Sequence, residues 1–247
     1  MLASTAAAGA ATEKNRTRYY ALHQFHLKFG TQPARIHEYF SKTFLPKLNK
    51  VHTGPKIFLD ALVAPHMPQV AAIVGYKSIE EYTEVLAALT KDEEFARGYT
   101  AWETGAEQPT EHYASTLLEA TEYSPDLTAP ATPPKTSRIF ELRVYHSPSF
   151  RQLQLLHERF AGPEIKIFHR VGVHPVLYAS TVFGANKPNL TYLIPFDDLA
   201  SREKAWNAFG ADPEWAKVRQ ESVERGGQIA SVIQIAIYRA TAYSPIR

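Results

Sequence analysis

The chain has 247 residues, of which 45% are hydrophobic and 21% are charged, and its formal net charge is +2. Because neither sign of charge is in excess, the composition gives no reason to expect a nucleic-acid partner. The sequence contains no cysteine, which excludes disulfides, thiolate catalysis, iron–sulfur ligation and covalent haem attachment through cysteine. It also lacks a run of about 18–20 apolar residues, so no transmembrane segment is expected.

The start of the chain, 1–14, is predicted to be a disordered leader or the remnant of a signal peptide. Residues 1–12 are small and uncharged, and Ala8-Gly9-Ala10 has the small-x-small form of a signal-peptidase site. No basic region precedes this site. The localisation is therefore left open, with export to the periplasm if the segment is a signal remnant and a cytoplasmic protein otherwise.

Elements of the first half of the chain can be predicted from the spacing of apolar residues. Residues 18–26 alternate as a strand does. Apolar side chains then recur at every fourth position from Ile36 to Leu48, which is typical of a helix. Two apolar runs, 57–63 and 70–76, flank a proline-containing turn and predict a hairpin.

A second helix and a last strand complete this half. Ser78 and Glu81 have the spacing of a capping box, which starts a helix. The last strand is predicted near 112–123. Asp92 is a further cap candidate, and its counterpart Asp212 is followed by a proline at a first helical position, where proline is tolerated.

An internal repeat relates the two halves at a constant offset of 120 residues. Residues 18–26 align with 138–146, and both halves close on the same pattern, at 120–125 and 240–245. Because a constant offset through every loop is hard to obtain by chance, the repeat indicates a tandem duplication. The second half then repeats the predicted elements, at 138–146, 151–171, 175–184, 189–196, 198–209 and 229–243.

The predicted order of elements in each half is β-α-β-β-α-β, that of the ferredoxin-like fold. Both helices then cover one face of a four-stranded antiparallel sheet, and the other apolar face must also be covered. Two units in one chain can cover each other. The predicted fold class is α+β: ferredoxin-like units at 15–125 and 138–247, joined by a proline-rich linker at 126–137, pack sheet to sheet as an intrachain α/β barrel.

Several segments of the second half are similar to one known protein family. They are the first strand at 140–145, the helix start at 197–203, the cluster at 211–215 and the closing Tyr-Ser-Pro at 243–245. On these segments the chain resembles the NIPSNAP family, and the first half fits more loosely. The resemblance implies the dimeric α/β-barrel fold. It implies little about activity, since the wider superfamily includes cofactor-free monooxygenases, haem enzymes and proteins of no known activity.

Polar residues on the first strands are the candidate site. Strand alternation places Glu141, Arg143 and Tyr145 on one face, with His23 and Phe25 as equivalents in the first half. We expect this face to point into the barrel, where these groups could orient a small acidic or carbonyl ligand and His23 could act as a general base. The alternative is that Glu141 and Arg143 only neutralise each other there.

Histidines at the strand ends are secondary candidates. His26 and His146 close equivalent strands, and each could transfer protons or simply bond a loop carbonyl. Metal binding needs three or four converging ligands, and the histidines are scattered along the sequence. No metal site and no cofactor are therefore expected.

The favoured interpretation is a NIPSNAP-like barrel of undefined activity that binds a small apolar or acidic molecule between the two sheets. One alternative is a cofactor-independent monooxygenase or isomerase-like enzyme that uses His23, Arg143 and Tyr145. Others are a haem-binding barrel and a protein-interaction scaffold. The sequence leaves open whether the protein is an enzyme and whether it forms a homo-oligomer.

Overall fold

The computed structural model describes residues 16–132, 134 and 136–247, so the leader expected at 1–14 lies outside the described residues. The first unit (19–120) contains, in chain order, β1 (Tyr19–His26), α2 (Gln32–Tyr39), the π-helical turn η1 (Phe40–Phe44), α3 (Leu45–Val51), β2 (Lys56–Val63), β3 (Gln69–Tyr76), α4 (Ile79–Lys91), α5 (Glu93–Glu103) and β4 (His112–Ala120).

The second unit (139–240) repeats this order. Its elements are β5 (Ile139–His146), α6 (Phe150–Arg159), the π-helical turn η2 (Phe160–Glu164), α7 (Ile165–Arg170), β6 (Leu177–Phe183), β7 (Asn189–Phe196), α8 (Leu199–Ala211), α9 (Pro213–Gly226) and β8 (Val232–Ala240). Strand registers also repeat at the offset of 120 residues: Tyr19 lies opposite Tyr76, and Ile139 lies opposite Phe196. The duplication therefore extends to the backbone.

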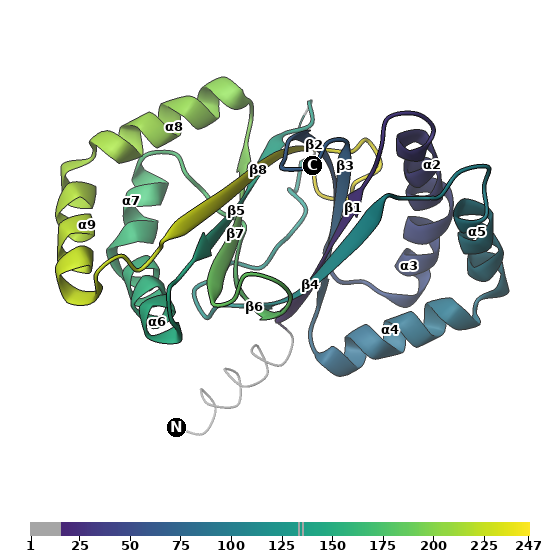
Figure 1. Ribbon diagram of the computed structural model, residues 1–247, viewed down its shortest axis with the longest axis horizontal. Helices are drawn as coiled ribbons and strands as arrows, with labels where there is room; N and C mark the ends of the chain where they lie inside the picture. Colours follow the sequence, from purple (N-terminus) through teal and green to yellow (C-terminus); the bar gives the residue numbers. More distant parts are fainter. Residues whose placement is uncertain (1–15, 133, 135) are drawn as a thin grey trace.

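The strands of the described residues form one closed antiparallel barrel, in the order β1-β3-β2-β8-β5-β7-β6-β4. Each unit contributes four adjacent strands, and the units join where β2 pairs with β8 and β4 pairs with β6. Figure 1 shows the barrel strands in the middle, with helices α2–α5 on one side and α6–α9 on the other. The predicted α+β fold, an intrachain α/β barrel of two ferredoxin-like units, is confirmed.

Apolar side chains from both units fill the barrel. The largest of them are the fully buried Tyr20, Phe140 and Tyr238. This cluster draws on strands of both units and on the segments that follow β4 and β8, and it includes no helix residue. The outer faces of the strands pack instead under the helices of their own unit, in separate clusters.

The segments that follow β4 and β8 close one end of the barrel. Leu127 and Ile246 are 2% and 3% exposed and belong to the interior cluster. The second residue of the linker predicted at 126–137 is thus packed, because the apolar barrel end needs a cover that the sheet does not supply. The end at which β4 and β8 begin carries the polar cavity described below.

The same segments cross between the units, and we call them the crossed tails (121–127 and 241–246). In the first tail, Ser124 Oγ accepts a hydrogen bond from the backbone N–H of Tyr178 at 2.9 Å, and the Tyr123 hydroxyl lies 2.7 Å from Nδ1 of His157. Both partners belong to the second unit, so the repeated Tyr-Ser-Pro pattern fastens one unit to the other.

The second tail makes the reciprocal contacts. Ser244 Oγ accepts from the backbone N–H of Phe58 at 3.0 Å, and the Tyr243 hydroxyl lies 2.9 Å from Nδ1 of His37. His37 and His157 occupy equivalent helix positions, and each contacts the tail of the other unit. This shared contact accounts for a histidine at both positions of the repeat.

Two helices differ from the sequence prediction. The predicted cap of α4 forms in part: Ser78 Oγ accepts from the N–H of Glu81 at 3.1 Å, whereas the Glu81 carboxylate accepts from the N–H of Lys77. However, each unit has an additional helix, α5 or α9, for which the sequence predicted only the caps Asp92 and Asp212 and no span. The Asp212 carboxylate caps α9 by accepting from two backbone N–H groups, at 2.9 and 3.0 Å. Across the described residues, each helix is too short or too polar to span a bilayer.

Candidate functional site

The first-strand residues lie on the opposite face from the predicted one. Leu142 and Leu22 point into the barrel with the interior cluster, whereas Tyr145 packs under the helices of the second unit. The prediction that Glu141, Arg143 and Tyr145 face the barrel interior is wrong. Alternation defines which residues share a face, but it does not show which face the helices cover. Arg202, a partner that neutralises Glu141, comes from α8.

Glu141 lies at the centre of a closed polar cluster beneath α8. Its fully buried carboxylate accepts from Arg143 at 2.9 Å, from Arg202 at 2.8 and 2.9 Å, and from the indole N–H of Trp206 at 2.8 Å. The Arg143 guanidinium lies 4.2 Å from the Trp206 ring centroid and 5.4 Å from that of Tyr145. Protein groups satisfy both oxygens of the Glu141 carboxylate, whereas Nε of Arg143 is buried without a hydrogen-bond partner among the described residues.

The predicted catalytic set does not converge. His23 lies beneath the helices of the first unit, while Arg143 and Tyr145 lie beneath those of the second. β1 and β5 belong to different four-stranded parts of the barrel, with their outer faces under different helices. The enzyme mechanism that combines His23, Arg143 and Tyr145 is therefore wrong.

Smaller side chains in the first unit open a cavity where the second unit is filled. At the 120-residue offset, Ala72 replaces the fully buried Tyr192, and Leu86 replaces Trp206. The result is a cavity of about 660 Å³ between the strands and helices α2–α5, which we call the first-unit cleft. Its volume is in the range of small-molecule sites.

Aromatic rings dominate the lining of the first-unit cleft. Phe25 contacts Phe40 edge-on, with ring centroids 5.2 Å apart, and lies 5.0 Å from Tyr113. Tyr39 stacks on Trp102 at 4.7 Å. Phe25, a predicted pocket residue, therefore lines a cavity, although this cavity is under the helices and not between the two sheets.

Two hydroxyl groups lie close to His23: that of Tyr113, which lines the first-unit cleft, and that of Ser115, which lies outside its lining. The Tyr113 hydroxyl is in hydrogen-bond contact with Nδ1 of His23, and Ser115 Oγ lies 3.3 Å from the same nitrogen. Burial lowers the pKa of His23 to about 4. The imidazole is therefore neutral at neutral pH, which makes it a hydrogen-bonding group and a weak base.

A second, smaller cavity lies inside the barrel at the end opposite the crossed tails. It has a volume of about 270 Å³, and we call it the barrel-mouth cavity. Its lining includes Gln24, Thr181 and Asn189, and Thr181 donates to the Asn189 side chain at 2.9 Å. This is the space between the two sheets that the sequence predicted, and it is lined by amide and hydroxyl groups and by apolar side chains.

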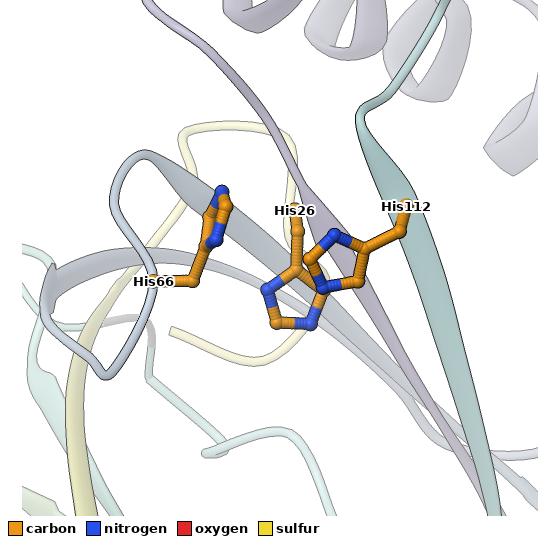
Figure 2. Close-up of side chains that lie close together, drawn as sticks. All are labelled: His26, His66 and His112. Atoms are coloured by element: carbon orange, nitrogen blue, oxygen red, sulfur yellow. The ribbon is translucent and has the colours of Figure 1, made fainter.

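The secondary candidates have different surroundings. Nε2 of His146 is buried and has no hydrogen-bond partner among the described residues. His26 lies beside two other histidines, His66 and His112, at the rim of the barrel mouth (Figure 2). The expectation that the histidines are scattered is thus wrong for these three.

The topology of the fold could have revealed this cluster. In a ferredoxin-like sheet β1 lies between β3 and β4, so the end of β1 adjoins the start of both strands. The register places His26 directly opposite His112 and Gln69. Because the three histidines are far apart along the chain, their spacing in the sequence does not indicate a cluster.

Comparisons with known proteins agree with the architecture. Residues 140–245 match the family model described as NIPSNAP. No curated protein matches the chain significantly. Among solved structures, an anthrone oxidase-like protein is similar at 14% identity, over 92% of this chain and 93% of that chain, with a TM-score of 0.58.

Two further solved structures have similar coverage. A monooxygenase-like protein from Fusobacterium nucleatum shares 12% identity over 92% of this chain and 93% of that one, with a TM-score of 0.55. A chlorite dismutase-like protein shares 11% identity over 93% and 96% of the two chains, with a TM-score of 0.51. At such low identity these similarities show the fold alone.

Proposed function

The second unit of this chain is a NIPSNAP domain on an α/β barrel, and we propose that the first unit binds a flat, mainly apolar small molecule. The observation that supports this function is the first-unit cleft of about 660 Å³, lined by aromatic rings. The same position in the second unit is filled by Tyr192 and Trp206. A ligand is the simplest reason for one copy of a duplicated fold to keep this space open.

The polar groups of the cleft define one end of the proposed ligand. A neutral His23 beside Tyr113 and Ser115 can donate or accept hydrogen bonds but supplies no charge at neutral pH. The Glu141 and Arg143 charges have no counterpart here, since Ala21 and His23 occupy their positions. We therefore propose a phenol, quinone or aromatic ketone as the ligand class, in place of the acidic ligand considered from the sequence.

Filling the cleft tests this proposal. Leu86→Trp introduces the side chain that the second unit carries at the equivalent position, and Leu86 lies in the cleft lining. In a thermal-shift screen with phenols, quinones and aromatic ketones, we expect at least one class to raise the Tm of the parent chain. The same compound should leave the Tm of Leu86→Trp unchanged, because the indole occupies its space.

The matched control is Ile79→Trp, which adds an indole to the exposed start of α4 outside the cleft lining. It should respond to the compound as the parent does. If a compound raises the Tm of the folded Leu86→Trp variant as it does that of the parent, the binding site lies elsewhere. A screen in which no class raises the parent Tm would count equally against the proposal.

A further inference from the structure

Three histidines from separate parts of the first unit meet at the rim of the barrel mouth. His26 ends β1, His66 lies in the turn between β2 and β3, and His112 begins β4, as Figure 2 shows. One ring nitrogen from each lies within 4.8 Å of the others. The ring centroids of His26 and His66 are 4.8 Å apart, and those of His66 and His112 are 5.1 Å apart.

The hydrogen bond of His66 leaves a lone pair available. Nε2 of His66 lies 3.0 Å from the backbone carbonyl of Leu27. Because a carbonyl only accepts hydrogen bonds, Nε2 carries the proton and Nδ1 presents its lone pair. A ring N–H donated to a backbone carbonyl is the arrangement that orients many metal-binding histidines.

His26 lies between the other two histidines, with its ring centroid 4.8 Å from that of His66 and 4.0 Å from that of His112. Nδ1 of His26 lies 3.2 Å from the side-chain Nε2 of Gln69, an amide donor, and so accepts a hydrogen bond. A metal ion bound at Nδ1 must displace this hydrogen bond, and one bound at Nε2 requires the ring proton to move to Nδ1. His112 is exposed, and the described residues place no acidic group in this cluster of ligand atoms.

We propose that His26, His66 and His112 bind a divalent transition-metal ion, for which Zn²⁺ is the probe of choice. Three imidazoles suit this class of ion, and a site with three protein ligands keeps a fourth position open. Pro65, the neighbour of His66 in the chain, lines the barrel-mouth cavity. The site lies at the rim of the barrel mouth and shares no residue with the lining of the first-unit cleft, so it goes beyond the proposed function.

Metal binding requires a small rearrangement of the rings. Nitrogens bound to one tetrahedral Zn²⁺ lie about 3.4 Å apart, given bonds of about 2.1 Å. His26 and His112 are stacked nearly parallel, with centroids 4.0 Å apart and an interplanar angle of 11°. Each lone pair lies in the plane of its ring, so one ring must turn, and the exposed His112 at the start of β4 is the one with room to do so.

The second unit provides the variants for a test. His66 corresponds to Asn186 and His112 to Val232, so this unit lacks the cluster although it retains His146. His66→Asn and His112→Val therefore introduce residues that the duplicated fold already carries at equivalent positions. His112→Val is the safer of the two, since its side chain is exposed and valine suits a strand.

The experiment is calorimetric titration of the chelator-treated, untagged chain with Zn²⁺. We expect one Zn²⁺ per chain, and an affinity at least about tenfold lower for both variants. Co²⁺ should give the visible absorption of a four-coordinate ion in the parent and lose it in the variants. The control is His169→Gln. His169 and His174 are exposed histidines whose ring centroids lie 5.2 Å apart. This variant should bind Zn²⁺ as the parent does.

Three results would overturn the proposal. The first is a parent chain that binds no Zn²⁺. The second is a folded His112→Val variant that keeps the parent affinity. The third is a loss of affinity in His169→Gln equal to that in His112→Val, since it would assign the binding to surface histidines.

Discussion

Glu141 shows how one buried carboxylate organises its surroundings. Four donor contacts from Arg143, Arg202 and Trp206 satisfy its two oxygens, and they connect β5 with α8. Burying a charge is costly unless it is paired and hydrogen-bonded. Removal of the carboxylate would leave Arg143, whose side chain is 10% exposed, without its nearest counter-charge.

Glu141→Leu is therefore expected to lower the free energy of unfolding by about 3–5 kcal/mol, the usual cost of breaking a buried ion pair from one side. Urea unfolding followed by circular dichroism measures the change. The control is Glu38→Leu, which removes an exposed ion pair between Glu38 on α2 and Lys42 on η1 and should hardly change the urea concentration at the midpoint of unfolding. Equal midpoints for the two variants would show that the cluster is not structural.

At the scale of the element, apolar periodicity predicted the helices because each buries one face, and apolar runs bounded by turn residues predicted the strands. Periodicity could not assign the faces of β1 and β5. Both faces of these strands are covered, one by the barrel interior and one by helices, so both carry large apolar side chains such as Phe140 and Tyr145. Only three-dimensional packing distinguishes them.

The candidate site was predictable in part for the same reason. His23 and Phe25 were found because they repeat the position of Arg143 and Tyr145, and they line the first-unit cleft. The cleft itself depends on small residues such as Ala72, and an alanine in a strand carries no signal of an adjacent cavity. Its importance becomes visible only through the comparison with Tyr192.

Ser78→Ala tests the helix start that the sequence did predict. The hydroxyl satisfies the N–H of Glu81 in the first turn of α4, and loss of such a cap lowers the free energy of unfolding by about 1 kcal/mol. Thermal unfolding should show a lower Tm for Ser78→Ala than for Thr83→Ala, an exposed hydroxyl inside the same helix. A Tm equal to that of Thr83→Ala would mean that the cap contributes nothing.

At the scale of the whole molecule, the crossed tails join the units beyond the pairing of their strands. Tyr123 contacts His157 and Tyr243 contacts His37, so each unit is closed in part by the end of the other. The barrel is completed within one chain, and its sheet needs no second copy to cover it.

Tyr243→Phe removes one of these tail contacts while keeping the ring. We expect the free energy of unfolding to fall by about 0.5–1.5 kcal/mol, as for a typical hydrogen bond. The matched control is Tyr99→Phe, whose hydroxyl donates a solvent-exposed hydrogen bond to Glu103 within α5. If the two variants unfold at the same urea concentration, the hydroxyl of the tail does not fasten the units.

The barrel of a single chain also has a consequence for how such a protein can change. In an assembly of two identical chains, a substitution that opens a cavity opens it twice, and both copies lose packing together. Here the two copies are encoded separately, so Ala72 could appear while Tyr192 stayed in place. One copy can thus keep the molecule folded while the other is free to acquire new chemistry.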